Sequence, residues 1–213
     1  AYRGILPSAT LNMYEANWFI FQRIFQPDQH VIDDDILTMS WGTNADDPVT
    51  LLWQRSIDAL VVRNQCLVVS GSGNGSSQET GIAKPSAGFN IISVGAAQGL
   101  GPIPDYLRYV GPPSPNQSSM GPTDDGRTKP DIIAPGLVLG PSASDAESYA
   151  EPRASVSCTS FAAPQVAGIA GLLLDAARYQ GWLDAEDPRV MKALLLNGAD
   201  KLTGWHKGQV GQA

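Results

Sequence analysis

Positive charge and cysteine are both scarce in this sequence of 213 residues. It carries 14 lysine and arginine residues against 21 aspartate and glutamate residues, for a formal net charge of −7 at pH 7. The sequence contains no basic run, which argues against a nucleic-acid ligand, because phosphate binding needs clustered Lys and Arg. Every apolar stretch is shorter than the roughly 20 residues that span a bilayer, and the chain opens without a charged-then-apolar leader. We therefore expect neither a membrane partner nor a signal peptide.

Cysteine occurs only at Cys66 and Cys158, each beside or within an apolar run. We expect buried free thiols, with a disulfide between them as the alternative, so cysteine usage leaves the compartment open. What the sequence does contain is 43% hydrophobic and 16% charged residues, which is typical of a globular chain that can bury a full core. The 22 glycines and 16 prolines favour an α/β fold rich in loops.

Short apolar runs alternate with helical patterns along the chain. We expect strands at 9–14, 36–40, 66–70, 91–95 and 131–134, and helices at 17–26, 48–64, 160–179 and 187–197. Residues 99–117 are rich in proline and predict a surface excursion, and 137–156 leave room for an antiparallel ribbon. Strands that alternate with helices imply a parallel sheet covered by helices on both faces, which binds ligands at the carboxyl ends of its strands.

The helix at 48–64 has a clear start signal, because Asp47 can cap it and Pro48 suits its first position. We expect it to bury its apolar residues, which are Leu51, Leu52, Ile57, Leu60 and Val61. The aromatic stripe of the helix at 17–26 is interpreted as core. The three consecutive acids that begin at Asp33 are interpreted as a solvated loop rather than a calcium site, since they lack the spaced oxygen ligands and the glycine turn.

The stretch from Ser157 to Gly168, SCTSFAAPQVAG, carries the strongest functional signal. Ser160 is followed by small residues, which let a helix start pack close beneath a sheet and leave the hydroxyl exposed. A helix N-terminus favours an anionic oxygen, as a serine nucleophile requires when its attack produces an oxyanion. The alternative is an ordinary helix start capped by Thr159 or Ser160.

A second signal is the asparagine of Gly73-Asn74-Gly75, which closes the loop after the strand at 66–70. An asparagine between glycines is often only a turn. The functional interpretation aims its side-chain amide at a developing negative oxygen. Ser40, this loop and Ser160 all fall at strand ends of the expected sheet, which favours a site.

These motifs resemble those of the subtilases, the subtilisin-like serine peptidases. The stretch at Ser160 is similar to G-T-S-x-A-A-P-x-V-A-G, with Cys158 where the family usually has glycine, and it implies that Ser160 is the nucleophile. The segment VVSGSGNGSS resembles V-x-A-A-G-N-x-G and implies that Asn74 serves the oxyanion. Residues 119–136 resemble S-x-G-P…D-G-R-x-K-P-D-x-x-A-P-G, whose role is mainly structural. The resemblance at Lys84-Pro85 predicts a cis peptide bond.

The resemblance also implies a binding site for a polypeptide substrate. The segment TMSWG at 38–42 resembles N-x-S-[LW]-G, whose edge pairs with an extended peptide, and it assigns substrate contacts to Ser40, Trp41 and Gly42. The opposite wall of the specificity pocket would be formed by Gly71, Ser72 and Gly73, and such small walls suit a bulky apolar side chain. No cofactor is implied; calcium is common in the family, but the sequence identifies no calcium or other metal site.

The family's aspartate motif D-x-G and histidine motif H-G-T are absent, although a serine nucleophile of this kind needs both side chains. His30 and His206 lie in other contexts and are expected in loops. The opening YRGILPSA is similar to the segment that follows the histidine motif. The resemblance therefore implies a partial subtilisin-like domain over 1–213, incomplete at its N-terminus, with the missing part as a candidate partner. By resemblance alone, an extracellular or cell-envelope location is favoured.

Three functions stay open at this point. The first is a part of an active serine endopeptidase that is inactive alone, which the retained Asn74 and Ser160 favour. The second is a degenerate subtilase that binds peptides, and the third is a peptide-cyclising acyl-transfer relative. A sedolisin-type acid peptidase is disfavoured, because the context of Asp125 lacks the usual glutamate base.

Overall fold

The fold is organised around a mainly parallel sheet. The computed structural model describes residues 4–25, 32–75, 81–98, 108–109, 118–136, 138, 140–141, 149–150 and 158–201. Among them, β1 (Ile36–Met39), β2 (Leu67–Gly71), β3 (Ile92–Gln98) and β5 (Ile132–Pro135) pair in parallel in that order. The short β4 (Arg108–Tyr109) adds an antiparallel pairing to the end of β3. The predicted parallel sheet is confirmed.

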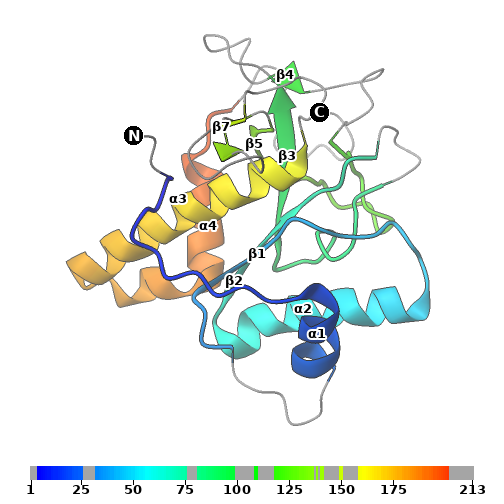
Figure 1. Cartoon of the computed structure of the whole chain (residues 1–213), viewed down its shortest axis with the longest axis horizontal. Coiled ribbons are helices and arrows are strands. Elements are labelled where there is room, and N and C mark those ends of the chain that lie inside the picture. Colours follow the sequence, from blue (N-terminus) through cyan, green and yellow to red (C-terminus); the bar gives the residue numbers. More distant parts are fainter. Residues whose placement is uncertain are drawn as a thin grey trace.

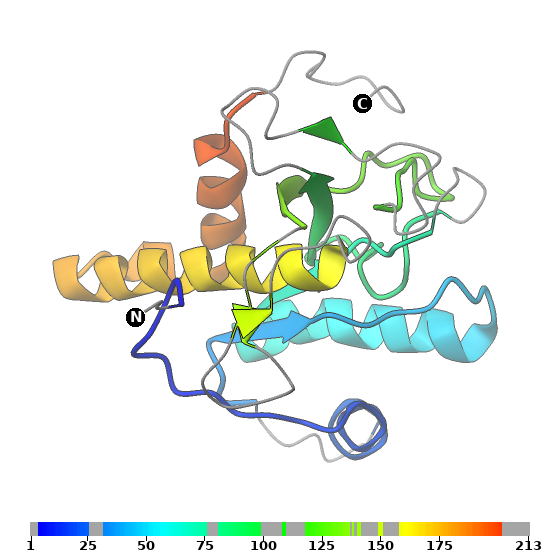
Figure 2. The same cartoon turned by 45° about the horizontal axis from the view of Figure 1, so that its top comes forward.

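Helices cover both faces of this sheet, as the alternation of strands and helices predicts. On one face lie α3 (Thr159–Gln180) and α4 (Pro188–Gly198), and on the other lie α2 (Pro48–Asn64), α1 (Ala16–Phe19) and the π-helix η1 (Ile20–Ile24). Figures 1 and 2 show α2 and α3 on opposite sides of the strands. Neighbouring β2 residues separate accordingly, because Leu67 and Val69 join the α3 core whereas Val68 joins the α2 core.

Helix α2 begins as the sequence predicts, but it buries a different face. The Asp47 carboxylate accepts the N–H groups of Val49 and Thr50 at 2.9 and 3.0 Å, and Pro48 follows it. The prediction that Leu52 is buried is wrong, since its side chain is 55% exposed while that of Trp53 is 4% exposed. The buried set recurs every three or four residues, as one helix face requires: Thr50, Trp53, Ile57, Leu60 and Val61.

Two other local predictions are corrected. Residues 9–14 form no strand, because their alternation finds no partner strand, and Leu11 and Met13 are 83% and 95% exposed. The helix expected at 17–26 is present as α1 followed directly by η1, so that its first turn is α-helical and the rest is a π-helix. The expected aromatic core is confirmed only in part: Phe19 and Ile24 are buried in the α2 core, whereas Trp18 and Phe21 are 44% and 54% exposed.

The remaining connections agree with the sequence where the structure describes them. The predicted ribbon is present as the antiparallel pair β6 (Gly140–Pro141) and β7 (Tyr149–Ala150). The Lys84–Pro85 bond is cis, as predicted, and so are two others, Gly121–Pro122 and Lys129–Pro130. Both cysteines are free, but Cys158 is half-buried where we expected it buried. The short 3₁₀ helix η5 (Leu183–Glu186) connects α3 to α4.

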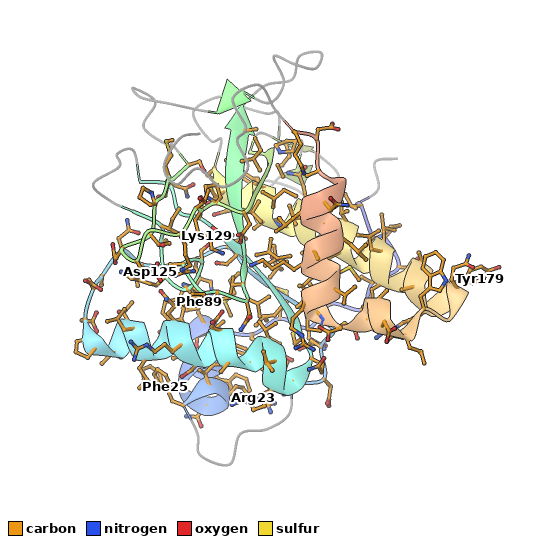
Figure 3. All side chains as sticks on the ribbon, turned by 180° about the vertical axis from the view of Figure 1, so that it is seen from behind. Arg23, Phe25, Phe89, Asp125, Lys129 and Tyr179 are labelled. Carbon is orange, nitrogen blue, oxygen red and sulfur yellow. The ribbon has the colours of Figure 1, made fainter. Side chains whose placement is uncertain are left out.

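Helix α3 is apolar on two sides, and in the described part of the chain only one of them is covered. Its sheet side buries small and aliphatic residues, which are Ala162, Ala163, Val166, Ala170 and Leu174. Its other side exposes an apolar stripe, defined as Phe161, Ile169, Leu172, Leu173 and Tyr179, with exposed fractions of 38%, 43%, 45%, 36% and 88%. Figure 3 shows Tyr179 projecting from the far end of this helix.

The expectation that no apolar stretch is long enough to span a bilayer is corrected for α3. By length and composition alone this helix could cross a membrane, because Pro164 and its glycines lie within it without ending it. Two of those glycines let the N-terminal segment cross closely. A Cβ on Gly168 would lie 3.0 Å from that of Ile5, and one on Gly171 would collide with the side chain of Leu6.

Candidate active site

The first turn of α3 presents Thr159 and Ser160 at the edge of the sheet. The N-cap residue is Cys158, with φ −154° and ψ 164°, and its side chain makes no capping hydrogen bond. The alternative that Thr159 or Ser160 caps this helix is therefore wrong. Because these dihedral angles are ordinary extended values, cysteine occupies the position without backbone strain. The Cys158 N–H also donates to the carbonyl oxygen of Gly136 at 3.0 Å, which fixes the chain as it enters the helix.

Ser160 and Ser40 are joined by two reciprocal hydrogen bonds. The Ser160 hydroxyl donates to the Ser40 carbonyl at 3.1 Å, and the Ser40 hydroxyl donates to the Ser160 carbonyl at 3.1 Å. Ser40 directly follows β1, so the end of that strand and the start of α3 are tied together. The Ser160 side chain is half-buried, which leaves part of it accessible.

Asn74 reaches the same helix start from the loop after β2. Its Oδ1 accepts the backbone N–H of Thr159 at 2.9 Å and the hydroxyl of Thr159 at 3.1 Å. The backbone donor identifies the oxygen, so the Nδ2 amine is directed away from Thr159. Within the described part of the chain, Nδ2 has no hydrogen-bond partner. This role of Thr159 was not predicted from the sequence, although its place directly before Ser160 was a signal.

This arrangement holds an amide donor and a hydroxyl at one helix N-terminus. A donor fixed before the reaction stabilises a developing negative oxygen without reorganising, and the partial positive charge of the helix end adds to it. The site lacks a base among the described residues, because the Ser160 hydroxyl donates to a backbone carbonyl and neither a carboxylate nor an imidazole is bonded to it. His30 and His206 lie outside the described residues.

The segment predicted to bind substrate is exposed and held from behind. Ser40, Trp41 and Gly42 are all exposed, and the indole of Trp41 stacks on that of Trp53 with ring centroids 4.7 Å apart. Gly42 lies against Lys84, whose carbonyl oxygen would be 2.7 Å from a Cβ at that position. The absence of a side chain at Gly42 is thus required by the protein's own backbone.

Gly71, Ser72 and Gly73, the predicted opposite wall of the pocket, have their Cβ positions turned toward the protein interior. A Cβ on Gly71 would lie 2.8 Å from the Thr159 hydroxyl oxygen, and Gly73 has φ +106°, in the region that favours glycine. The Ser72 side chain is fully buried, and its hydroxyl donates to the carbonyl of Ser119 at 3.2 Å. Any substrate contact made by these three residues would therefore come from their backbone.

Acidic residues away from Ser160 have structural partners. The carboxylate of Asp34 accepts hydrogen bonds from Asn12 and Tyr14 at 2.6 and 2.7 Å, and Asp35 pairs with Arg178. Asp33 and Asp35 are exposed, as expected of a solvated acidic loop, and these partners add to that description. A cavity of about 810 Å³ lies beside these acids, at the opposite end of α3 from Ser160. Among the described residues, no group of three or more His, Cys, Asp or Glu could hold a metal ion.

Comparisons with known proteins place nearly the whole sequence in a family. The profile described as "Subtilase family" matches residues 8–211. Pyrolysin of Pyrococcus furiosus is 29% identical over 192 residues, which are 80% of this chain and 13% of that protein. Serine protease AprX of Bacillus subtilis is 31% identical over 201 residues, which are 86% of this chain and 41% of that protein.

Solved structures show the same likeness. The self-cleaved protease domain of PatA superposes with a TM-score of 0.53 at 27% identity, over 78% of this chain and 54% of that one. The S41 psychrophilic protease superposes with a TM-score of 0.55 at 22% identity over 76% of this chain and 48% of that one, which supports the fold alone. The chain thus spans about half, or less, of the relatives that it matches.

Proposed function

The chain belongs to the subtilase family, and from that premise we propose that it is the nucleophile-bearing part of a serine endopeptidase. In this proposal the Ser160 oxygen attacks a peptide carbonyl, and Asn74 Nδ2 donates to the resulting oxyanion. The hydroxyl proton passes to a histidine oriented by a carboxylate, and then to the leaving amine as the C–N bond breaks. Water hydrolyses the acyl-enzyme by the same route. The histidine and the carboxylate come from outside this chain.

The observation that carries the proposal is the direction of the Asn74 amide. Because Oδ1 is held by both the N–H and the hydroxyl of Thr159, the Nδ2 donor is turned outward beside the residue that precedes Ser160. An ordinary turn asparagine needs no such anchor on a helix more than 80 residues away in sequence. A polypeptide substrate fits the exposed segment at Ser40, Trp41 and Gly42, and an extracellular or cell-envelope location rests on family resemblance alone.

We also propose where the missing part of the domain attaches. Among the described strands, β1 pairs only with β2, so its other edge is open. The apolar stripe of α3 lies uncovered, and the reactive helix end needs a base. One occupant satisfies all three: an α/β segment of the subtilase domain that adds a strand beside β1, covers the stripe and supplies the histidine and carboxylate.

A polypeptide fits this surface better than a membrane does. The buried side of α3 packs on an open sheet, and unpaired sheet edges are not tolerated in the hydrocarbon of a bilayer. The net charge of −7 also disfavours the anionic surface of a membrane. The relatives extend well beyond their match to this chain, which is consistent with a further segment in the domain.

The proposal is tested by reaction with a fluorophosphonate, measured as intact mass. The chain alone is compared with a chimera in which the part of AprX that precedes its match is joined ahead of Ala1. We expect no adduct on the chain alone and one adduct on the chimera, absent when Ser160→Ala is introduced. An adduct on the chain alone would show that a base lies within it. A chimera that folds, docks its segment and stays unlabelled would favour the peptide-binding alternative.

Docking is measured separately from reactivity, by hydrogen exchange of the amides of β1 and α3 in the same two proteins. Joining supplies the segment at a millimolar effective concentration, so exchange at β1 and along the stripe should slow. Leu172→Glu should undo this protection, since it places a charge in the stripe. Leu52→Glu is the matched control, because that leucine is similarly exposed but lies on α2. Equal effects of the two variants would exclude the stripe as the docking surface.

A further inference from the structure

The loop that carries Asn74 is held by one buried serine, Ser119, which lies between β4 and β5 in the sequence. The Ser119 N–H donates to the carbonyl of Gly73 at 2.8 Å, and the Ser119 hydroxyl accepts the N–H of Gly75 at 3.1 Å. These two hydrogen bonds grip the residues immediately before and after Asn74. Ser119 itself is fully buried, so the grip is shielded from competing water.

Packing also brings the backbone of the loop close to this serine. Gly73 has φ +106°, and a Cβ there would lie 2.8 Å from the Ser119 hydroxyl oxygen and 3.0 Å from Ala83. The carbonyl of Ser119 also accepts the hydroxyl of Ser72 at 3.2 Å. Backbone, side chain and packing therefore all join the loop to the same residue.

The gripping segment is itself fixed to the sheet. The hydroxyl of Ser118 accepts the N–H of Ala96, in the middle of β3, at 3.0 Å, and lies 3.2 Å from the hydroxyl of Ser72. Ser118 is 2% exposed. The residues that hold the Asn74 loop are thus themselves bonded to β3, a central strand, rather than to another loop.

From this geometry we propose that Ser119 is the positioning residue of Asn74: it fixes the backbone on both sides of Asn74 so that Oδ1 meets Thr159 and Nδ2 faces the oxyanion. Without Ser119, the contacts that position Asn74 would be those of its own Oδ1 with Thr159. The inference rests on the proposed function only for the purpose of that orientation. The orientation itself can be measured without any catalysis.

The test uses the chain alone and follows the Thr159 amide by hydrogen exchange in NMR, because that amide donates to Asn74. Ser119→Ala should speed its exchange about tenfold, and should broaden or shift the Asn74 side-chain amide resonances. Exchange at Val69, in the core of β2, corrects for any change in global stability. Ser86→Ala is the control, since that hydroxyl is equally buried and lies within hydrogen-bond distance of the Ser70 carbonyl and the Ser93 hydroxyl.

A faster Thr159 amide in Ser119→Ala but not in the control, after correction at Val69, supports the assignment. Equal changes in both variants, or none in either, overturn it. If Ser119→Ala does not fold, the unmodified chain decides: the Thr159 and Gly75 amides should open together, with protection factors within about threefold of one another. A difference above about tenfold would refute the assignment. Fluorophosphonate labelling of the chimera remains the separate test of the peptidase proposal.

Discussion

Ser160 and Ser40 each donate a hydroxyl proton to the other's carbonyl oxygen, at 3.1 Å in both directions. The proposed nucleophile and the end of β1, where we propose that substrate binds, therefore fix each other's position. The hydroxyl proton of Ser160, which a catalytic base would have to remove, is donated to the Ser40 carbonyl in this structure. A histidine that activates Ser160 must draw this proton away from Ser40, whereas the bond from Ser40 to Ser160 can persist.

Replacing Ser40 separates these two bonds. Ser40→Ala removes only the donation to the Ser160 carbonyl, since the acceptor for the Ser160 hydroxyl is the backbone of residue 40. We expect a loss of about 0.5–1 kcal/mol in the free energy of unfolding, at the lower end for a hydrogen bond because the pair is exposed. Urea unfolding measures it, with Ser40→Thr as a control that keeps the hydroxyl. Equal losses in the two variants would mean that packing, not the bond, is responsible.

Replacing Asn74 tests its donor apart from its acceptor. Asn74→Asp keeps an oxygen for the Thr159 N–H but loses the Nδ2 donor, so the loop should stay in place. In the chimera we expect the rate of labelling or peptide hydrolysis to fall by about 10²–10³, which is the loss that removing one oxyanion donor causes in a member of this family. Asn74→Ala should lose as much rate and, in addition, should release the Thr159 amide. An active Asn74→Asp variant would contradict the donor role.

Two leucines on α3 test which of its sides is covered in the chain alone. Leu172 is 45% exposed and Leu174 is 8% exposed, although they lie two residues apart. We expect Leu174→Ala to cost about 2–5 kcal/mol, because it leaves a cavity against the sheet. Leu172→Ala should change the free energy of unfolding by no more than about 0.5 kcal/mol. Comparable losses in urea unfolding would show that the apolar stripe is already covered, for example by a second copy of the chain.

The buried thiol of Cys66 predicts a dependence of stability on alkaline pH. Burial raises the pKa of Cys66 to about 12, from about 8.5 in an unfolded chain. Above pH 8.5 the folded chain keeps a proton that the unfolded chain loses, so this group makes stability fall as pH rises, by up to about 1.4 kcal/mol per pH unit. Burial of Lys129 acts in the opposite direction, because it lowers the pKa of that ammonium to about 8 despite its ion pair with Asp131.

Removing the Cys66 thiol should therefore leave Lys129 to dominate the pH dependence of stability in this range. In Cys66→Ala the free energy of unfolding should rise between pH 8.5 and 10, since the unfolded chain then binds more protons at Lys129 than the folded chain does. Unfolding in urea under reducing conditions measures this slope. The same slope in the unmodified chain and in Cys66→Ala would refute the assignment to Cys66.

The sequence predicts the elements of this fold best where a local signal has one physical meaning. Asp47 followed by Pro48 is a combination that suits the start of a helix and little else. The short apolar runs at β2 and β3 suit strands that are buried on both faces. The alternation at 9–14 predicts a strand equally clearly, but a strand also needs a neighbour, and no local signal tells whether one exists. Leu52 and Trp53 show the same limit, because either helix phase satisfies the apolar pattern.

The candidate site divides in the same way. Ser160 and Asn74 could be singled out because the chemistry requires their side chains and the neighbouring residues are typical of the family. Thr159 as an anchor of Asn74, and Ser119 as the grip on its loop, could not be predicted. Their roles depend on contacts between segments that only the assembled sheet brings together.

The long sequence separation of these contacts has a consequence for a newly made chain. Ser160 meets Ser40 across 120 residues, and Thr159 meets Asn74 across 85. Contacts of such range form late, because closing a long loop costs entropy before the contact repays it. A half-synthesised chain that still lacks α3 therefore cannot hold Asn74 against Thr159 or Ser40 against Ser160. The topology thus makes assembly of the proposed site one of the last steps of folding.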